Sequence, residues 1–185
     1  MTARSVSVAS KMRARWPIFA GLAVAVLVAD QLTKSWLVSF LAPGQRTEVF
    51  GSYVRLIHTQ NSGALFGLFR DQAILFAFVS IGVVGMIIWF HGSAGRNTPL
   101  SVALGLLLGG ALGNMADRFR YGYVVDFVDL GIGDLRWYTF NVADAAISCA
   151  ILLLLLSAFM PEKWRSGVLG DGSGGGDQPE GRTDA

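Results

Sequence analysis

Residues 138–160 read YTFNVADAAISCAILLLLLSAFM, and this stretch decides which fold the chain can adopt. A helix needs about 20 mostly apolar residues to cross the hydrocarbon layer of a membrane, and the stretch is long enough to do so. Asn141 and Asp144 stand near its start, and an unbroken apolar run follows from Ile151 to Leu156. The stretch is therefore predicted to be a membrane-spanning helix with polar groups at its beginning.

Three further stretches have the same character. The chain of 185 residues is 52% hydrophobic and only 15% charged, with a mean hydropathy of +0.49, which is not the composition of an ordinary soluble domain. We therefore predict an all-α membrane protein with four transmembrane helices. The other three expected spans are Pro17 to about Phe40, Ala73 to Phe90 and Leu100 to Ala116.

The segments between the expected helices differ in composition. Residues 41–70 contain a Pro43-Gly44 turn and several β-branched and aromatic residues, which predicts a small β-sheet at the extracytoplasmic membrane surface. Residues 92–99 form a short polar turn. Residues 118–137, rich in aromatic and acidic side chains, are expected to be a connecting segment between the third and fourth helices.

Basic residues at the N-terminus predict the orientation. They precede the first span and, by the positive-inside tendency, place the N-terminus in the cytoplasm, although three arginines in the first outer loop fit this rule less well. Four crossings return the C-terminus to the cytoplasm. The expected organisation is a basic extension over residues 1–15, a four-helix domain over 16–162 and a disordered cytoplasmic tail over 163–185. A cleavable signal peptide over residues 1–29 is the competing interpretation.

Five carboxylates gather around the third connection, and Asp30 of the first span could join them. The end of the third helix and the start of the fourth flank this connection, so their acids lie on one side of the membrane. With a cytoplasmic N-terminus, that side is the outer one. Ionisable groups at membrane depth are costly unless they face protein or water, so these acids are functional candidates. The five are Asp117, Asp126, Asp129, Asp134 and Asp144.

A close pair of carboxylates would suit peptide hydrolysis. Two such groups in a low-dielectric site cannot both ionise easily, so the pair carries one proton near neutrality. The ionised acid takes a proton from the attacking water, while the protonated acid polarises the scissile carbonyl and later protonates the leaving amine. This chemistry needs neither a metal nor a cofactor. Ser148 and Ser157 are far in sequence from either histidine, so a serine nucleophile is not favoured.

Several polar residues have structural interpretations. Asp30 and Lys34 are spaced as an i, i+4 ion pair, and Asp117 could pair with Arg118, so a helix-fastening role is favoured for these acids and Lys34. His58 and His91 lack partners at metal-ligand spacing. The single cysteine, Cys149, is expected to be a small buried apolar residue.

Gly131-Ile132-Gly133-Asp134 spells GxGD, which resembles the signature of presenilin-type and prepilin aspartyl proteases. In those proteases the motif lies in a transmembrane helix, whereas here it falls in a polar connection. A turn that uses the conformational freedom of glycine is the favoured interpretation.

Five ordered features resemble the lipoprotein signal peptidase family, also called signal peptidase II. The resemblance covers residues 17–160, with four matching spans. The features are the polar pair Asp30 and Lys34, Asn61–Gly67 as NxGAxFG, Gly113–Arg118 as GNxxDR, Gly122–Asp129 as VxDFxD, and Phe140–Asp144 as FNxAD.

The resemblance implies a metal-independent aspartyl peptidase, without a cofactor, in the bacterial cytoplasmic (inner) membrane. Its substrate would be a diacylglyceryl-modified prolipoprotein, cut by water attack on the amino side of the lipidated cysteine. Asp126 and Asp144 would form the catalytic dyad, near the outer surface. The chain would contact membrane lipid but no nucleic acid, and would be a monomer.

The resemblance also implies roles for the surrounding residues. Four side chains would orient the dyad or hold the substrate backbone, one of them from the surface sheet that cradles the substrate. Three others would be structural supports. The first set is Asn61, Asn114, Arg118 and Asn141, and the second is Asp30, Lys34 and Asp117.

Two other functions remain open on the residues alone. A small transporter or proton-conducting protein would use Asp30, Asp117, Asp126 and Asp144 as a relay, and would lack peptidase activity. A metal-dependent lipid phosphotransferase would hold Mg²⁺ with Asp117, Asp126 and Asp129, and would lose activity with a chelator.

Overall fold

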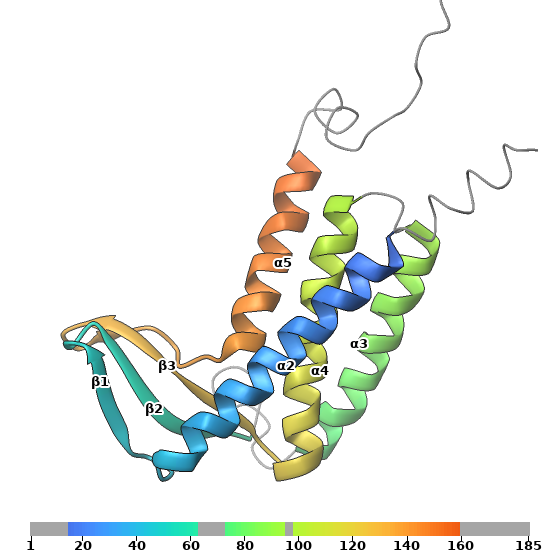
Figure 1. Cartoon of the computed structure of the whole chain (residues 1–185). Helices are drawn as coiled ribbons and strands as arrows, with labels where there is room; N and C mark the ends of the chain where they lie inside the picture. Colours follow the sequence, from blue (N-terminus) through green and yellow to red (C-terminus); the bar gives the residue numbers. More distant parts are fainter. Residues whose placement is uncertain (1–14, 63–72, 95–97, 160–185) are drawn as a thin grey trace, which may run out of the picture.

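Four helices long and apolar enough to cross a membrane form the body of the protein. The computed structural model describes residues 15–62, 73–94 and 98–159. The predicted N-terminal extension, except Arg15, the predicted tail and residues 63–67 of the NxGAxFG block lie outside these ranges. The helices are α2 (Trp16–Phe40), α3 (Ala73–Ala94), α4 (Thr98–Tyr121) and α5 (Val142–Phe159), as Figure 1 shows.

Helix α4 packs against each of the other three helices. Close approach is possible because α4 presents glycines where its neighbours cross. A Cβ at Gly109 would lie 2.7 Å from the carbonyl oxygen of Ala23 on α2, and one at Gly110 would lie 2.5 Å from that of Ala143 on α5. Small residues that let backbones approach are typical of interfaces between membrane helices. These glycines therefore make α4 the centre of the bundle.

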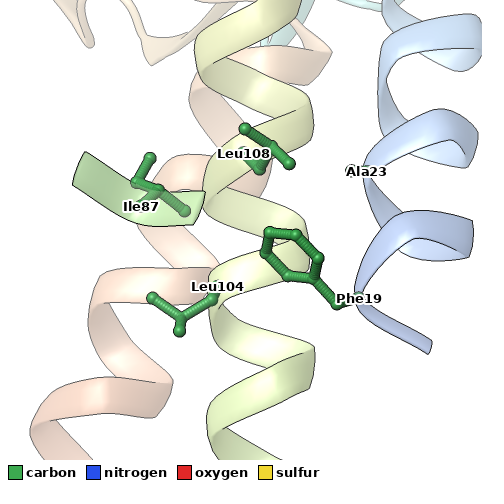
Figure 2. Packing of buried hydrophobic residues seen from close by; sticks show 5 residues of the cluster. All are labelled: Phe19, Ala23, Ile87, Leu104 and Leu108. Atoms are coloured by element: carbon green, nitrogen blue, oxygen red, sulfur yellow. The ribbon is translucent and has the colours of Figure 1, made fainter. Parts of the chain in front are cut away.

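An apolar cluster fills one end of the bundle, between α2, α3 and α4. Figure 2 shows the ring of Phe19 pointing from α2 toward Leu104 and Leu108 of α4, with Ile87 of α3 nearby. All of these side chains are buried. At this end of the bundle the helices are held together by apolar packing, and the polar residues lie toward the other end.

The expected surface sheet is present and has four antiparallel strands in the order β1-β2-β3-β4. Residues 41–70 supply two of them, as predicted. Residues 118–137 connect α4 to α5 as expected, and the structure adds that most of this segment is strand, which pairs with β2 and extends the sheet. The strands are β1 (Arg46–Phe50), β2 (Val54–Asn61), β3 (Val124–Ile132) and β4 (Leu135–Arg136).

A second apolar cluster holds the sheet to the helices. Leu37 and Leu41, at the end of α2, are buried against Val125 and Phe127 of β3. Side chains alternate in direction along a strand. Asp126 lies between Val125 and Phe127, so its side chain is directed away from this cluster. Strand β3 thereby directs an acid toward the opposite face of the sheet.

Two further expectations change at α5. The helix begins at Val142 and not near Tyr138, because Asn141 caps it. Its side-chain oxygen accepts a hydrogen bond from the backbone N–H of Asp144 at 2.9 Å. Cys149 is exposed and not buried, since the buried face of α5 is made by its alanines.

The GxGD motif covers the end of β3 and the predicted turn to β4, which Gly133 and Asp134 form. Gly133 adopts a φ of +58°, which L-residues other than glycine rarely take, and Asp134 lies in the same turn. The motif therefore has a structural explanation at the edge of the sheet.

Candidate functional site

Asp126 lies on β3 and is almost completely buried, with 4% of its surface exposed. Asn61, at the end of β2, donates a side-chain hydrogen bond to its Oδ2 at 3.0 Å. Asn141 donates another to its Oδ1 at 2.6 Å. Both oxygens of this buried acid therefore accept an amide N–H, one from the sheet and one from the start of α5.

Asp144 lies in the first turn of α5 and is partly buried. Its Oδ1 accepts a hydrogen bond from the side-chain amide of Asn114 on α4 at 2.8 Å. Its Oδ2 lies 3.3 Å from the backbone nitrogen of Asn141, which donates to it. Together with the cap described above, this contact makes Asn141 and Asp144 a reciprocal capping pair.

Asn141 brings the two acids to one point. Its side-chain amide contacts Asp126, and its backbone and side-chain oxygen contact Asp144. The same amide nitrogen also donates to Oδ1 of Asn114 at 3.1 Å, and that asparagine in turn donates to Asp144. The structure therefore joins the two acids of the predicted dyad through two asparagines.

The electrostatics of the two acids are coupled. Two effects raise the pKa of Asp126 from 3.8 to about 6: burial, which is the larger, and the negative charge of Asp144. The hydrogen bonds from Asn61 and Asn141 and the charge of Lys34 act in the opposite direction and do not offset the increase. Near neutrality Asp126 is thus far easier to protonate than an aspartate in water.

A buried ion network between α2 and α4 supports Asn114. Lys34 is 3% exposed, and its Nζ lies 2.7 Å from Asp30 Oδ2 and 2.8 Å from Asp117 Oδ2. It also donates to Oδ1 of Asn114 at 3.1 Å. Because Lys34 and Asn141 both contact this oxygen, the NH₂ group of Asn114 is left to face Asp144. The favoured structural role of Asp30, Lys34 and Asp117 agrees with these contacts.

The two acids of this network also hold backbone groups next to the dyad. Asp30 accepts a hydrogen bond from the backbone N–H of Ala143 at 3.0 Å, one residue before Asp144. Asp117 accepts one from Val125 at 3.1 Å, one residue before Asp126. Asp117 is therefore paired with Lys34 and β3, and not with its neighbour Arg118 as one expectation had it.

Gln31 belongs to the site but was not predicted. Its amide donates to Asp117 Oδ1 at 2.9 Å and to the carbonyl oxygen of Gly113 at 3.2 Å, and so fastens α2 to α4. The sequence contained an indication of this role, since an amide side chain at membrane depth is expected to have a partner in another helix.

Arg118 lies beside a cavity of about 250 Å³ between α3, α4 and α5. Its guanidinium donates to the backbone oxygen of Asn114 at 3.3 Å and lies 5.7 Å from the ring centre of Phe76. Asn114 also lines the cavity, whose other walls are mostly apolar. The cavity therefore extends from the amide that holds Asp144 into an apolar region. The remaining lining residues are Val79, Ser80, Val83, Ala111 and Ile147.

The other candidate residues lie elsewhere. Asp129 forms an ion pair with Arg136 at 2.8 Å, and Asp134 is exposed in the β3–β4 turn, so neither joins the dyad. His58 is buried on β2 and contacts the carbonyl oxygen of Leu41. His91 stacks on Phe19 at 4.0 Å between ring centres, far from the acids in the fold.

These contacts disfavour the alternative function, a metal-dependent lipid phosphotransferase that holds Mg²⁺. It requires Asp117, Asp126 and Asp129 to share one ion, but Asp129 is paired with Arg136 and Asp117 with Lys34. Over the described ranges, no group of three or more histidines, cysteines and acids has the arrangement of a metal site. The proton-relay alternative fits better, since Asp30, Asp117, Asp126 and Asp144 lie in one hydrogen-bonded network.

Comparison with known proteins gives one consistent result. The family model described as Signal peptidase (SPase) II matches residues 22–160. The lipoprotein signal peptidase of Pseudoalteromonas atlantica is 41% identical over 146 residues, which cover 76% of this chain and 88% of the relative. That of Caulobacter vibrioides is 39% identical over 158 residues, covering 82% and 91%.

A solved structure gives the same result for the fold. A bacterial membrane enzyme superposes with a TM-score of 0.68 at 30% identity, over 75% of this chain and 90% of that one. The four spans and the sheet therefore form an architecture that is known in membrane enzymes.

Proposed function

The chain belongs to the signal peptidase II family of membrane peptidases, and from this premise we propose that Asp126 and Asp144 hydrolyse the signal-peptide bond of lipid-modified prolipoproteins. The observation that carries the proposal is Asn141, which contacts both acids and so holds them at one point. No metal or cofactor takes part in the proposed reaction.

The raised pKa of Asp126 supports the proposed chemistry. With a pKa of about 6, Asp126 is protonated in about a tenth of molecules at pH 7, and the negative charge of Asp144 favours that proton. Protonated Asp126 polarises the scissile carbonyl by donating to its oxygen. Ionised Asp144 takes a proton from the water that attacks the carbonyl carbon.

The reaction then ends with loss of the amine. A bond from the water oxygen to the carbonyl carbon has formed, and the C–N bond breaks as a proton moves from the dyad to the leaving nitrogen. The products are a free carboxylate on the signal peptide and a free amine on the lipidated cysteine. The asparagines do not exchange protons; they hold the acids in register.

Three neighbouring groups suit substrate binding. Arg118 and Asn114 line the cavity beside the dyad, where their polar atoms can meet the backbone of an extended peptide. The apolar walls suit the hydrophobic segment of a signal peptide. Asn61 reaches Asp126 from strand β2 of the sheet. Substrate would therefore lie between the helices and the sheet.

The lipid anchor accounts for the depth of the site. A substrate held by two acyl chains is confined to the bilayer, so its scissile bond arrives at a set distance from the surface. The dyad lies where α5 begins and the sheet meets the bundle, which suits such a bond. The basic N-terminal residues support an orientation with both termini in the cytoplasm and the dyad near the outer surface.

Cleavage of a purified diacylglyceryl-modified precursor in lipid nanodiscs tests this function. We expect a product that begins with the lipidated cysteine, little cleavage of the unmodified precursor, and an unchanged rate with a chelator. Transport without cleavage would favour the relay. Loss of cleavage with the chelator would favour metal chemistry.

A further inference from the structure

One end of the sheet exposes large apolar side chains. Leu135 is 81% exposed, Phe50 72% and Ile132 71%. These exposed fractions are similar to that of Trp89, at 70%, on the lipid-facing surface of a helix. In a protein surrounded by water such a patch would be costly, and exposed apolar patches commonly mark interaction surfaces. We call this patch the apolar tip. It consists of Phe50, Tyr53, Ile132, Leu135 and Trp137.

The apolar tip is one continuous feature, although its residues come from separate segments. Val54 pairs with Leu130, and the backbone N–H of Gly131 donates to the carbonyl oxygen of Tyr53 at 3.0 Å. Arg136 then ties the two turns together, because its guanidinium contacts Asp129 and the carbonyl oxygen of Ser52. The β1–β2 turn and the β3–β4 turn therefore lie side by side.

The length of α5 indicates where the boundary of the hydrocarbon layer lies along the bundle. At the usual rise of about 1.5 Å per residue its 18 residues span about 27 Å. The hydrocarbon layer is about 30 Å thick, so the described residues of α5 nearly match it, and the first turn of α5 lies near the boundary. Helices α2 and α4 are 25 and 24 residues long, and their ends extend past this boundary.

The apolar tip lies at the same depth as the first turn of α5. Figure 1 shows the sheet leaving the far end of α2 and turning back beside the bundle, so that its tip reaches the level where α5 begins. Trp137 is also only five residues before Val142, the first residue of α5. The tip therefore faces the boundary zone and not the water beyond it.

From these observations we propose that the apolar tip inserts into the interfacial layer of the bilayer that the four helices span. The occupant is membrane lipid, because the patch combines aliphatic side chains with Tyr53 and Trp137, which prefer that layer. Apolar residues on α5 such as Ile151 and Leu152 are exposed as well. Insertion would anchor the sheet, and with it the strand that carries Asp126, at a set height.

The test measures the depth of the tip in lipid nanodiscs that hold one chain each. Nitroxide labels are attached at Leu135→Cys or Phe50→Cys in a Cys149→Ser background, in phosphatidylcholine and phosphatidylglycerol. Their collision rates with oxygen, which concentrates in lipid, and with a water-soluble nickel chelate are compared. The control is Thr47→Cys, which is exposed on β1 nearer to α2.

Lipid insertion predicts that both tip labels favour oxygen over nickel severalfold more than the control label does. Equal ratios at the tip and the control would overturn the proposal. Protection of the tip from both reagents would also overturn it, in favour of a protein contact. If Leu135→Cys lowers the melting temperature, Ile132→Cys reports on the same turn, since these residues pair.

Discussion

Asn141 Nδ2 lies 2.6 Å from Asp126 Oδ1, while the backbone nitrogen of the same residue donates to Asp144 Oδ2 at 3.3 Å. One residue thus serves as a helix cap and as the connection between two acids on different elements. These two roles can be separated by substitution, because a cap requires only a side-chain acceptor.

Asn141→Ser tests the connection with the cap retained. Serine caps helices well but lacks the NH₂ group that contacts Asp126 and Asn114, so we expect little change in thermal stability. Cleavage should fall on the order of 10²-fold, since the acids lose their relative position. The comparison variant Asn141→Ala should lose the same activity and also about 1 kcal/mol of stability. Equal activity of Asn141→Ser and wild type would contradict this role.

The pKa of Asp126 predicts a pH dependence. Its value of about 6 means that kcat/KM falls as the pH rises above about 6, because the free enzyme loses the shared proton. Asp144→Asn removes a charge that raises this pKa, so the carboxyl ¹³C titration of Asp126 should move to lower pH. Burial is the larger cause, and the pKa should stay above 3.8. An unchanged midpoint would show that the acids are not coupled.

The same pKa affects stability. A carboxyl whose pKa is raised in the folded state binds more protons there, so it lowers the free energy of unfolding as the pH rises from about 4 to about 6. Asp126→Asn should remove this decrease from the unfolding curve, measured by chemical denaturation in detergent at several pH values. An identical pH dependence in the variant would contradict the assignment.

Lys34→Met should be strongly destabilising. It leaves Asp30 and Asp117 buried without their shared cation, and breaking a buried ion pair costs roughly 3–5 kcal/mol. Thermal unfolding in lipid checks the loss. The variant Lys34→Met with Asp117→Asn removes one uncompensated charge and should recover part of it. No difference between the single and double variants would count against the network.

Gly109→Ala tests the close packing of α2 and α4. The new Cβ would meet the backbone of Ala23 at 2.7 Å, so we expect a loss of about 1–3 kcal/mol. Gly82→Ala on α3 is the matched control, because no neighbouring atom lies within 4 Å of its Cβ position. It should be neutral or stabilising, by up to roughly 1 kcal/mol. Equal melting temperatures of the two variants would exclude tight packing at Gly109.

The helices were predictable because long apolar runs have one dominant solution in a membrane. Strand β3 was not, since Asp126 and Asp129 interrupt its β-branched residues and make the segment resemble a polar connection. Its longest pairing is with β2, and that pairing is not local in sequence. The start of α5 differs from the prediction for a local reason. The prediction placed Asn141 inside the helix, whereas Asn141 caps it.

That the acids gather at one end of the bundle followed from topology alone, but their contacts did not. Sequence spacing suggested Arg118 as a partner of Asp117, whereas Lys34 reaches it across the interface between α2 and α4. Gln31 was missed for the same reason, since its partners lie on another helix. Contacts between helices depend on rotation and depth, which the apolar pattern of each helix leaves undetermined.

The central claim is that Asp126 and Asp144 act as one catalytic unit, and cleavage rates of Asp126→Asn, Asp144→Asn and the double variant test it most directly. The assay uses a lipid-modified precursor, with Asp134→Asn in the exposed β3–β4 turn as the control. We predict that each single variant loses roughly 10²- to 10⁴-fold or more in rate. The double variant should be no slower than the slower single variant, and the control should match wild type. A rate close to wild type in either single variant, with the protein folded, would contradict the claim.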